Sequence, residues 1–135
     1  MDEQQILNLL KCAKEISDNA YAPYSKFSVG CAVLLKDGGV ITGVNVENAS
    51  FSVTICAERV ALAQVVTLKK QRLIKAIAIV TQSSPVGFPC GACRQFIEEI
   101  VPTDIPIIVG NHADEWLATN ILDLLPHPFN KKSLP

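Results

Sequence analysis

The stretch FSVGCAVLLKDGGVITGVNV, residues 27–46, decides the fold. It contains two apolar runs, 27–35 and 40–46, which flank Asp37-Gly38. An Asp-Gly pair between two such runs is typical of a tight β-hairpin, because glycine tolerates the positive φ that the turn needs. We therefore expect two antiparallel strands here.

The segment before this hairpin has a helical pattern, and the segments after it alternate between helical and strand patterns. Before it, apolar residues recur at helical spacing from Ile6 to Ile16, and Pro23 follows the end of that pattern. After it, we predict helices over 56–69, 90–100 and 121–125, and strands over 74–81, 105–110 and 115–119. Apolar strands separated by helices are typical of a sheet that is covered on both faces.

These elements predict an α/β fold: a three-layer α-β-α sandwich on a mixed central sheet of about five strands. The sheet is mixed because the hairpin strands are antiparallel. The chain has 135 residues and contains no repeat, linker or low-complexity tract. A chain of this length is typical of one domain, which we take to span 1–135.

The charge balance limits the classes of partner. Twelve basic residues nearly match thirteen acidic ones, which argues against nucleic acid or an anionic membrane as the main partner. The N-terminal MDEQQ does not resemble a signal peptide, and no apolar run approaches the roughly 18 residues of a membrane span. We therefore expect a soluble, cytoplasmic protein.

Five cysteines, an odd number, favour buried thiols or metal ligands over a disulfide framework. Cys90-x-x-Cys93 brings two sulfurs together at the start of a helix, where both can bind Zn²⁺. Cys56 also lies at a strand–helix junction and is the predicted third ligand. Cys12 and Cys31 lie among apolar neighbours and are interpreted as small buried hydrophobes. The predicted site thus has three sulfurs and an open position for water, as catalytic zinc sites do.

Glu58 follows Cys56 by two residues, and the pair can share a target only at a helix N-terminus. Farther along a helix they would diverge, because each residue turns by about 100°. Glu58 is therefore predicted to accept a proton from a water that zinc has made acidic. Three thiolates and one Zn²⁺ leave a net negative charge, which Arg59 or Arg94 could offset together with the helix N-termini. Arg59 is the preferred candidate.

Cys-x-Glu at one junction and Pro-Cys-x-x-Cys at the next match the layout of zinc nucleobase deaminases. From about Ala22 to Phe129, the chain resembles a cytidine deaminase of the small, homotetrameric type. The matching stretches are YSKFSVGCAV, TGVNVENAS, TICAERVAL, PCGACRQ and LLPHPF. The resemblance implies hydrolytic deamination of cytidine and 2′-deoxycytidine to the uridines with release of ammonia, as in pyrimidine salvage. It also implies one Zn²⁺ per subunit, bound by the three cysteines, and a proton shuttle at Glu58.

The resemblance further implies a set of substrate contacts. The backbone N–H of Ala57 binds the base, and Phe27 packs on the base. Asn45 and Glu47 hold the ribose 3′-OH, and their alternation along a strand end lets both face one side of the sheet. Without the resemblance, Phe27 would be interpreted as a core residue.

Similar proteins complete the site with residues from a neighbouring subunit. Ala49, Phe51 and Phe129 match the positions that do so, which implies a homotetramer with shared active sites. Phe51 departs from the family, which often has tyrosine there, so a polar contact near the 5′ end of the nucleoside is in question. The tail 130–135 has no role in this resemblance.

Three alternatives follow from the same residues. A deaminase of another cytosine compound, such as blasticidin S, would share the zinc motifs but differ at the stretch NVENAS, 45–50. A noncatalytic zinc-binding interaction module would need a fourth protein ligand, such as Cys31, and would not need Glu58. A nucleotide or polynucleotide deaminase is disfavoured because Glu47 near the sugar would repel a phosphate.

Overall fold

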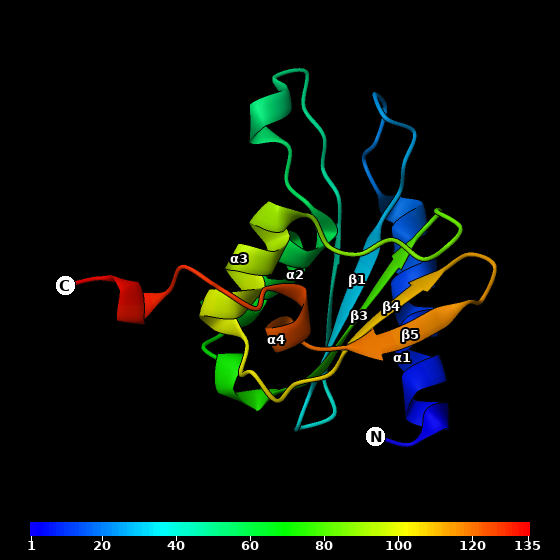
Figure 1. Cartoon of the computed structure of the whole chain (residues 1–135). Helices are drawn as coiled ribbons and strands as arrows, with labels where there is room; N and C mark the ends of the chain where they lie inside the picture. The colour runs from blue at the N-terminus through cyan, green and yellow to red at the C-terminus, as the bar shows by residue number, and fades with distance from the viewer.

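The computed structural model describes all residues from Met1 to Pro135, and its centre is a five-stranded sheet in the order β2-β1-β3-β4-β5 (Figure 1). The strands are β1 Gly30–Leu35, β2 Val40–Val44, β3 Ile74–Thr81, β4 Ile107–Asn111 and β5 Trp116–Thr119. Strand β1 is antiparallel to both β2 and β3, β3 is parallel to β4, and β5 is antiparallel to β4. The predicted mixed sheet is confirmed.

Helices cover both faces of the sheet, as Figure 1 shows. They are α1 Glu3–Ile16, α2 Ala57–Thr67, α3 Gly91–Ile100 and α4 Ile121–Leu124. Short 3₁₀ helices span Ser17–Asn19, Phe51–Val53, Gln71–Leu73 and Lys131–Ser133. Helix α1 lies alone on one face, and the other three α-helices lie on the opposite face. No helix is long and apolar enough to cross a bilayer.

The buried strand β3 shows why two cores form. Ile77 and Ile79 pack in the core beneath α2, α3 and α4, while Ala76, Ala78 and Val80 face α1. This alternation follows from the two-residue period of a strand. The small alanines on the α1 face let that helix lie close to the sheet.

The hairpin forms at the predicted residues. Gly38 has φ +91°, and the Leu35 N–H donates to the Gly39 carbonyl over 2.8 Å. Both strands are shorter than predicted, however, because Asn45 interrupts the ladder beyond Val44. Its side chain accepts from the Val29 N–H at 2.9 Å and donates to the Phe27 carbonyl at 2.8 Å. Phe27 and its neighbours are thereby kept outside the sheet, beside the site described below.

The helix boundaries also differ from the predicted ones by one or two residues. Helices α2 and α3 begin one residue later than predicted, because Cys56 and Cys90 are N-caps with extended backbone. Helix α2 ends at Thr67, and Lys69 follows with φ +56°, which no helix continues. The β4 strand begins at Ile107, two residues later than predicted.

Gly43 sets the distance between β2 and α2. A Cβ at this position would lie 2.6 Å from both the Ala57 carbonyl oxygen and the Ala61 nitrogen. Those atoms belong to the helix backbone, so the whole first half of α2 would have to move. The absence of a side chain at Gly43 therefore positions the N-terminus of α2 against the sheet.

We predict that Gly43→Ala lowers the free energy of unfolding by about 1–3 kcal/mol, because it overpacks this contact. Gly91→Ala is the matched control, since a Cβ there meets no atom within 4 Å. Urea unfolding of both variants checks the prediction, and equal stabilities for the two would contradict it.

Candidate metal centre and active site

Two helix N-termini bring three sulfurs together. Cys56 is the N-cap of α2, Cys90 is the N-cap of α3, and Cys93 lies in the first turn of α3. The two helices pack against one another on the same face of the sheet. Helix N-termini present free N–H groups and a positive dipole end, which stabilise negative charge on the sulfurs.

The three sulfurs have the spacing that one zinc ion requires. All lie within 4.8 Å of one another, and the Cys56 and Cys90 sulfurs are 3.9 Å apart. Tetrahedral zinc with bonds of about 2.3 Å would separate two sulfurs by about 3.8 Å. No other His, Cys, Asp or Glu joins the cluster, and Cys31 is buried in the core. These residues fit a zinc site with three protein ligands.

The sequence predicts that Cys31 and Cys12 are both small buried hydrophobic residues. The prediction is right for Cys31 and wrong in part for Cys12. Cys31 is fully buried within the larger core. Cys12 is only half-buried, because α1 turns it toward the edge of its contact with the sheet. Neither thiol has a partner at ligand distance.

Hydrogen bonding within the cluster favours a thiolate on Cys56. A hydrogen bond from Cys93, and then one from Arg59, lowers the pKa of Cys56 to about 5. The pKa of Cys93 is raised, because its proton is held against the Cys56 sulfur. The Cys56 sulfur is thus predisposed to carry the negative charge that a metal cation neutralises.

Arg59 and Arg94 play different structural roles. Arg59 donates from Nη2 to the Thr54 carbonyl at 3.3 Å and to the Cys56 sulfur at 3.7 Å. Arg94 instead donates from Nε to the Pro89 carbonyl at 2.7 Å and from Nη1 to the Leu124 carbonyl at 2.8 Å. Only Arg59 reaches a sulfur, whereas Arg94 ties the segment before Cys90 to α4.

Glu58 lies beside the sulfurs in the first turn of α2. Its side chain is only 4% exposed. Burial raises the pKa of Glu58, and the nearby negative charge of Cys56 raises it further. A carboxyl group whose pKa moves toward neutrality can both accept and return a proton at physiological pH.

A cavity of about 260 Å³ opens over this cluster. It is lined by Ser25, Phe27, Val29, Asn45, Glu47, Thr54, Cys56, Ala57, Glu58, Ile79, Thr81, Phe88, Pro89 and Cys90. The structure therefore brings all four predicted substrate contacts of this chain to the same hollow as Glu58. Phe27 is 38% exposed and lines this cavity, so its interpretation as a core residue is wrong.

Sequence reasoning missed Ser25, Thr54, Thr81 and Phe88 as cavity residues. Three of them have a local signal that could have been used. Thr54 and Phe88 each precede a ligand cysteine by two residues, and Thr81 ends the buried strand β3. Ser25 has no such signal, because its contact is with a residue far along the chain.

Glu47 and Asn45 are held firmly at the sugar side of the predicted site. The Glu47 carboxylate accepts from the Tyr24 N–H at 2.9 Å and from both the N–H and the hydroxyl of Ser25. The Ser25 hydroxyl is the main reason that the pKa of Glu47 is lowered. Glu47 is therefore an ionised, acceptor-only group, which suits a hydroxyl donor.

Ala49, Phe51 and Phe129 do not line this chain's own cavity. Ala49 is exposed, and the exposed fractions of Phe51 and Phe129 are 74% and 62%. The Phe51 ring packs edge-to-face with the exposed Tyr24 ring, at a centroid distance of 5.9 Å. These three residues are thus free to contact another molecule.

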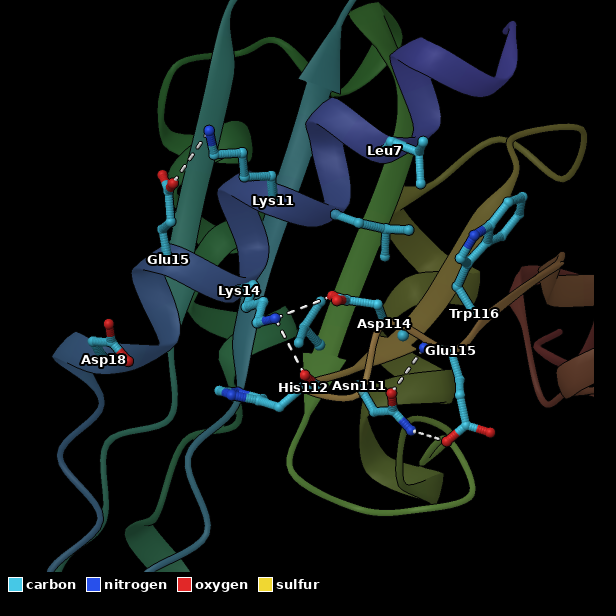
Figure 2. A pocket seen from close by; sticks show the side chains of 13 residues that line it. Leu7, Lys11, Lys14, Glu15, Asp18, Asn111, His112, Asp114, Glu115 and Trp116 are labelled. Carbon is cyan, nitrogen blue, oxygen red and sulfur yellow. Dashed lines mark hydrogen bonds and ion pairs between the residues drawn. The ribbon is translucent and has the colours of Figure 1, made fainter.

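A larger hollow of about 530 Å³ lies on the opposite face, between α1 and the β4–β5 edge (Figure 2). Its polar groups mostly bind one another. Lys14 donates to the His112 carbonyl at 3.2 Å and pairs with Asp114 at 3.0 Å, and Asn111 donates to Glu115 at 2.9 Å (Figure 2). We infer that the smaller cavity is the candidate active site, because Glu58 and the zinc-site residues Cys56 and Cys90 line it and do not line the larger hollow.

The fold and the site together define a class: a mixed α-β-α sandwich with three sulfurs and a buried glutamate is typical of zinc-dependent nucleobase deaminases. Residues 3–109 match the cytidine and deoxycytidylate deaminase zinc-binding region, and the chain belongs to this family. The predicted family and its zinc cofactor are confirmed.

Individual relatives agree with this assignment. A cytidine deaminase of Halalkalibacterium halodurans is 41% identical over 134 residues, which cover 99% of this chain and 98% of the relative. The crystal structure of a cytidine deaminase from Burkholderia pseudomallei aligns with a TM-score of 0.89 and 38% identity, covering 96% of this chain and 100% of that one. A blasticidin-S deaminase of Bacillus cereus is more distant: it is 30% identical, and the match covers 95% of this chain and 94% of that protein's sequence.

We predict that Arg59→Gln weakens zinc binding by about 10–100-fold, because the variant loses the cation beside the Cys56 sulfur. Competition with a chelator measures the affinity. Arg72→Gln, at an exposed position, is the matched control and should bind zinc as the wild type does. Unchanged affinity in Arg59→Gln would rule out charge compensation by Arg59.

Proposed function

We propose that this protein catalyses the hydrolytic deamination of cytidine and 2′-deoxycytidine to uridine and 2′-deoxyuridine, with release of ammonia. The observation that carries this proposal is one cavity lined by Glu58, by Cys56 and Cys90 of the three-sulfur cluster, and by the Asn45–Glu47 pair. The first group supplies proton transfer, the second binds the metal, and the third suits a sugar hydroxyl. The cytidine deaminases among its relatives, at about 40% identity, support the same activity.

Cys56, Cys90 and Cys93 would hold the zinc ion. When bound, zinc makes a water molecule nucleophilic at neutral pH by lowering its pKa. Arg59 offsets part of the thiolate charge, which preserves the strength of the metal as a Lewis acid. The two helix N-termini do the same through their free N–H groups.

Glu58 moves the protons of the reaction. Its carboxylate accepts a proton from the attacking water and delivers it to N3 of the cytosine ring as C4 is attacked. A second proton then passes through the same carboxylate to the departing amine, which leaves as ammonia. The raised pKa of Glu58 suits it to both the accepting and the donating step.

The remaining cavity residues orient the nucleoside. The Ala57 N–H lies in the first turn of α2, where amides have no helical partner, and it donates to the base. Phe27 packs on the base, and Asn45 and Glu47 bind the 3′-OH. No residue is assigned to the 2′-OH, which accounts for the acceptance of both sugars.

The alternative substrates are less well supported. The blasticidin-S deaminase relative is more distant than the cytidine deaminases, and Glu47 supplies a ligand for a sugar hydroxyl. A side-by-side rate comparison of blasticidin S with cytidine decides between them. A noncatalytic zinc module is disfavoured, because the cluster has no fourth protein ligand.

The active assembly is a homotetramer with shared sites. Ala49, Phe51 and Phe129 are exposed, and each would contact the substrate in a neighbour's site. Gln95 donates to the Phe129 carbonyl at 2.6 Å, and the Asn130 side chain donates to Glu98 at 3.2 Å, so α3 holds the chain at Phe129 and at the residue after it. This arrangement favours presentation of Phe129 to another subunit.

The proposed function also bears on the domain extent, the cellular compartment and the partners of this protein. One sheet links the residues of the site, which favours a single catalytic domain over 1–135. All five cysteines are free thiols, which suits the reducing cytoplasm, and the reaction serves pyrimidine salvage there. A nucleoside is the partner, with no role for nucleic acid or a membrane.

We predict that purified protein converts cytidine to uridine, seen as a loss of ultraviolet absorbance. Glu58→Gln should lower turnover by about 10²–10⁴-fold, because the amide cannot carry a proton. Zinc content should remain at one ion per chain in this variant. Glu3→Gln, in the exposed first turn of α1, is the control. Full activity in Glu58→Gln would remove Glu58 from the mechanism, and an inactive zinc-loaded wild type would contradict the function.

We predict that Phe129→Ala lowers kcat/KM for cytidine by about tenfold while light scattering still shows a tetramer, because the lost contact belongs to the substrate. Mixing Phe129→Ala subunits with Glu58→Gln subunits should restore activity. In such mixtures, a site with an intact Glu58 can receive Phe129 from a neighbour. Failure of mixing to restore activity, or an active monomer, would contradict shared sites.

A further inference from the structure

The turn formed by residues 21–28 wraps around the carboxylate of Glu47. Glu47 Oε1 accepts two backbone N–H groups, from Tyr24 at 2.9 Å and from Ser25 at 3.1 Å. Glu47 Oε2 accepts the Ser25 hydroxyl. One exposed turn thus supplies three donors to a side chain more than 20 residues away in the sequence.

The Ser25 hydroxyl has a defined direction. The Phe27 N–H donates to Ser25 Oγ at 3.0 Å, so a lone pair of the hydroxyl is occupied. Glu47 is ionised and can only accept. The single hydroxyl proton therefore points to Glu47 Oε2.

The backbone of the turn is held in place at several points. The Tyr21 N–H donates to the Asn45 carbonyl at 3.0 Å, and the Glu47 N–H donates to the Tyr21 carbonyl at 2.8 Å. Lys26 has φ +59°, a left-handed conformation that costs energy for a residue with a side chain. Such a conformation persists where surrounding contacts determine it, and the three bonds to Glu47 are such contacts.

The hydrogen bonds from the turn leave one acceptor site of the Glu47 carboxylate free. An ionised carboxylate has about four lone-pair sites, two on each oxygen. The turn fills both sites of Glu47 Oε1 and one site of Oε2. One site on Oε2 is left for a ligand, and Ser25, Phe27 and Glu47 all line the cavity.

We propose that Ser25 is a positioning residue: it fixes the Glu47 carboxylate so that a single acceptor site on Oε2 receives one sugar hydroxyl, the 3′-OH. This inference rests on the proposed function and extends it. A carboxylate with one free site can bind one hydroxyl and not two neighbouring ones. The carboxylate therefore binds the 3′-OH, and its binding does not depend on whether a 2′-OH is present.

Kinetics of Ser25→Ala with three substrates test this inference. The KM for cytidine and for 2′-deoxycytidine should rise about tenfold, as expected for loss of a hydrogen bond to a charged group, and kcat should change by less than about twofold. With 3′-deoxycytidine, which lacks the hydroxyl in question, Ser25→Ala and the wild type should have nearly the same KM. Ser25→Thr keeps the hydroxyl and should restore the low KM for cytidine.

Ser28→Ala is the matched control, because Ser28 lies in the same turn and its hydroxyl makes no hydrogen bond. The inference is overturned if Ser25→Ala behaves as the wild type with cytidine, or if its KM rises equally with 3′-deoxycytidine. Failure of Ser25→Ala to fold also overturns it, since the hydroxyl would then stabilise the fold as a whole. An inactive wild type would instead refute the proposed function itself.

Discussion

The meeting of two helix N-termini on one face of the sheet is the constraint on which the site depends. It places Cys56, Cys90 and Cys93 within 4.8 Å of one another although 34 residues separate Cys56 from Cys90. It also lets Glu58 approach the same point, which a position farther along α2 would not allow. The buried strands β1 and β3 and the close contact at Gly43 serve this geometry, because they determine where α2 begins.

Much of this arrangement could be predicted from local sequence patterns. The Asp37-Gly38 turn and the apolar run of β3 specify the sheet, and the Cys-x-x-Cys spacing specifies two ligands within a single helical turn. The strand ends could not be predicted, because the Asn45 side chain takes over backbone groups that would otherwise pair in the ladder. The contact of Ser25 could not be predicted from the sequence for a similar reason: its partner Glu47 is 22 residues away and is brought near only by the fold.

The site has two halves that are held by different means. Glu58, Ala57 and Cys93 are buried and belong to helices that pack on the main core. Phe27, Glu47 and Ser25 lie on exposed segments held by hydrogen bonds. In the proposed function, the core thus supports the residues that bind the metal and carry the proton, while surface segments support the residues that bind the sugar.

This division has a consequence for specificity. A substitution among the buried residues alters packing around the metal and costs both stability and turnover. A substitution in the exposed turn 21–28 costs little stability, because few buried contacts depend on it. The exposed half can therefore change the ligand that it binds while the buried half with the metal site is kept. A family with one kind of metal site can thus accept cytosine compounds that differ in the part of the molecule attached to the base. Under the proposed function, the three donors converging on Glu47 are the part of this chain that commits the exposed half to a nucleoside.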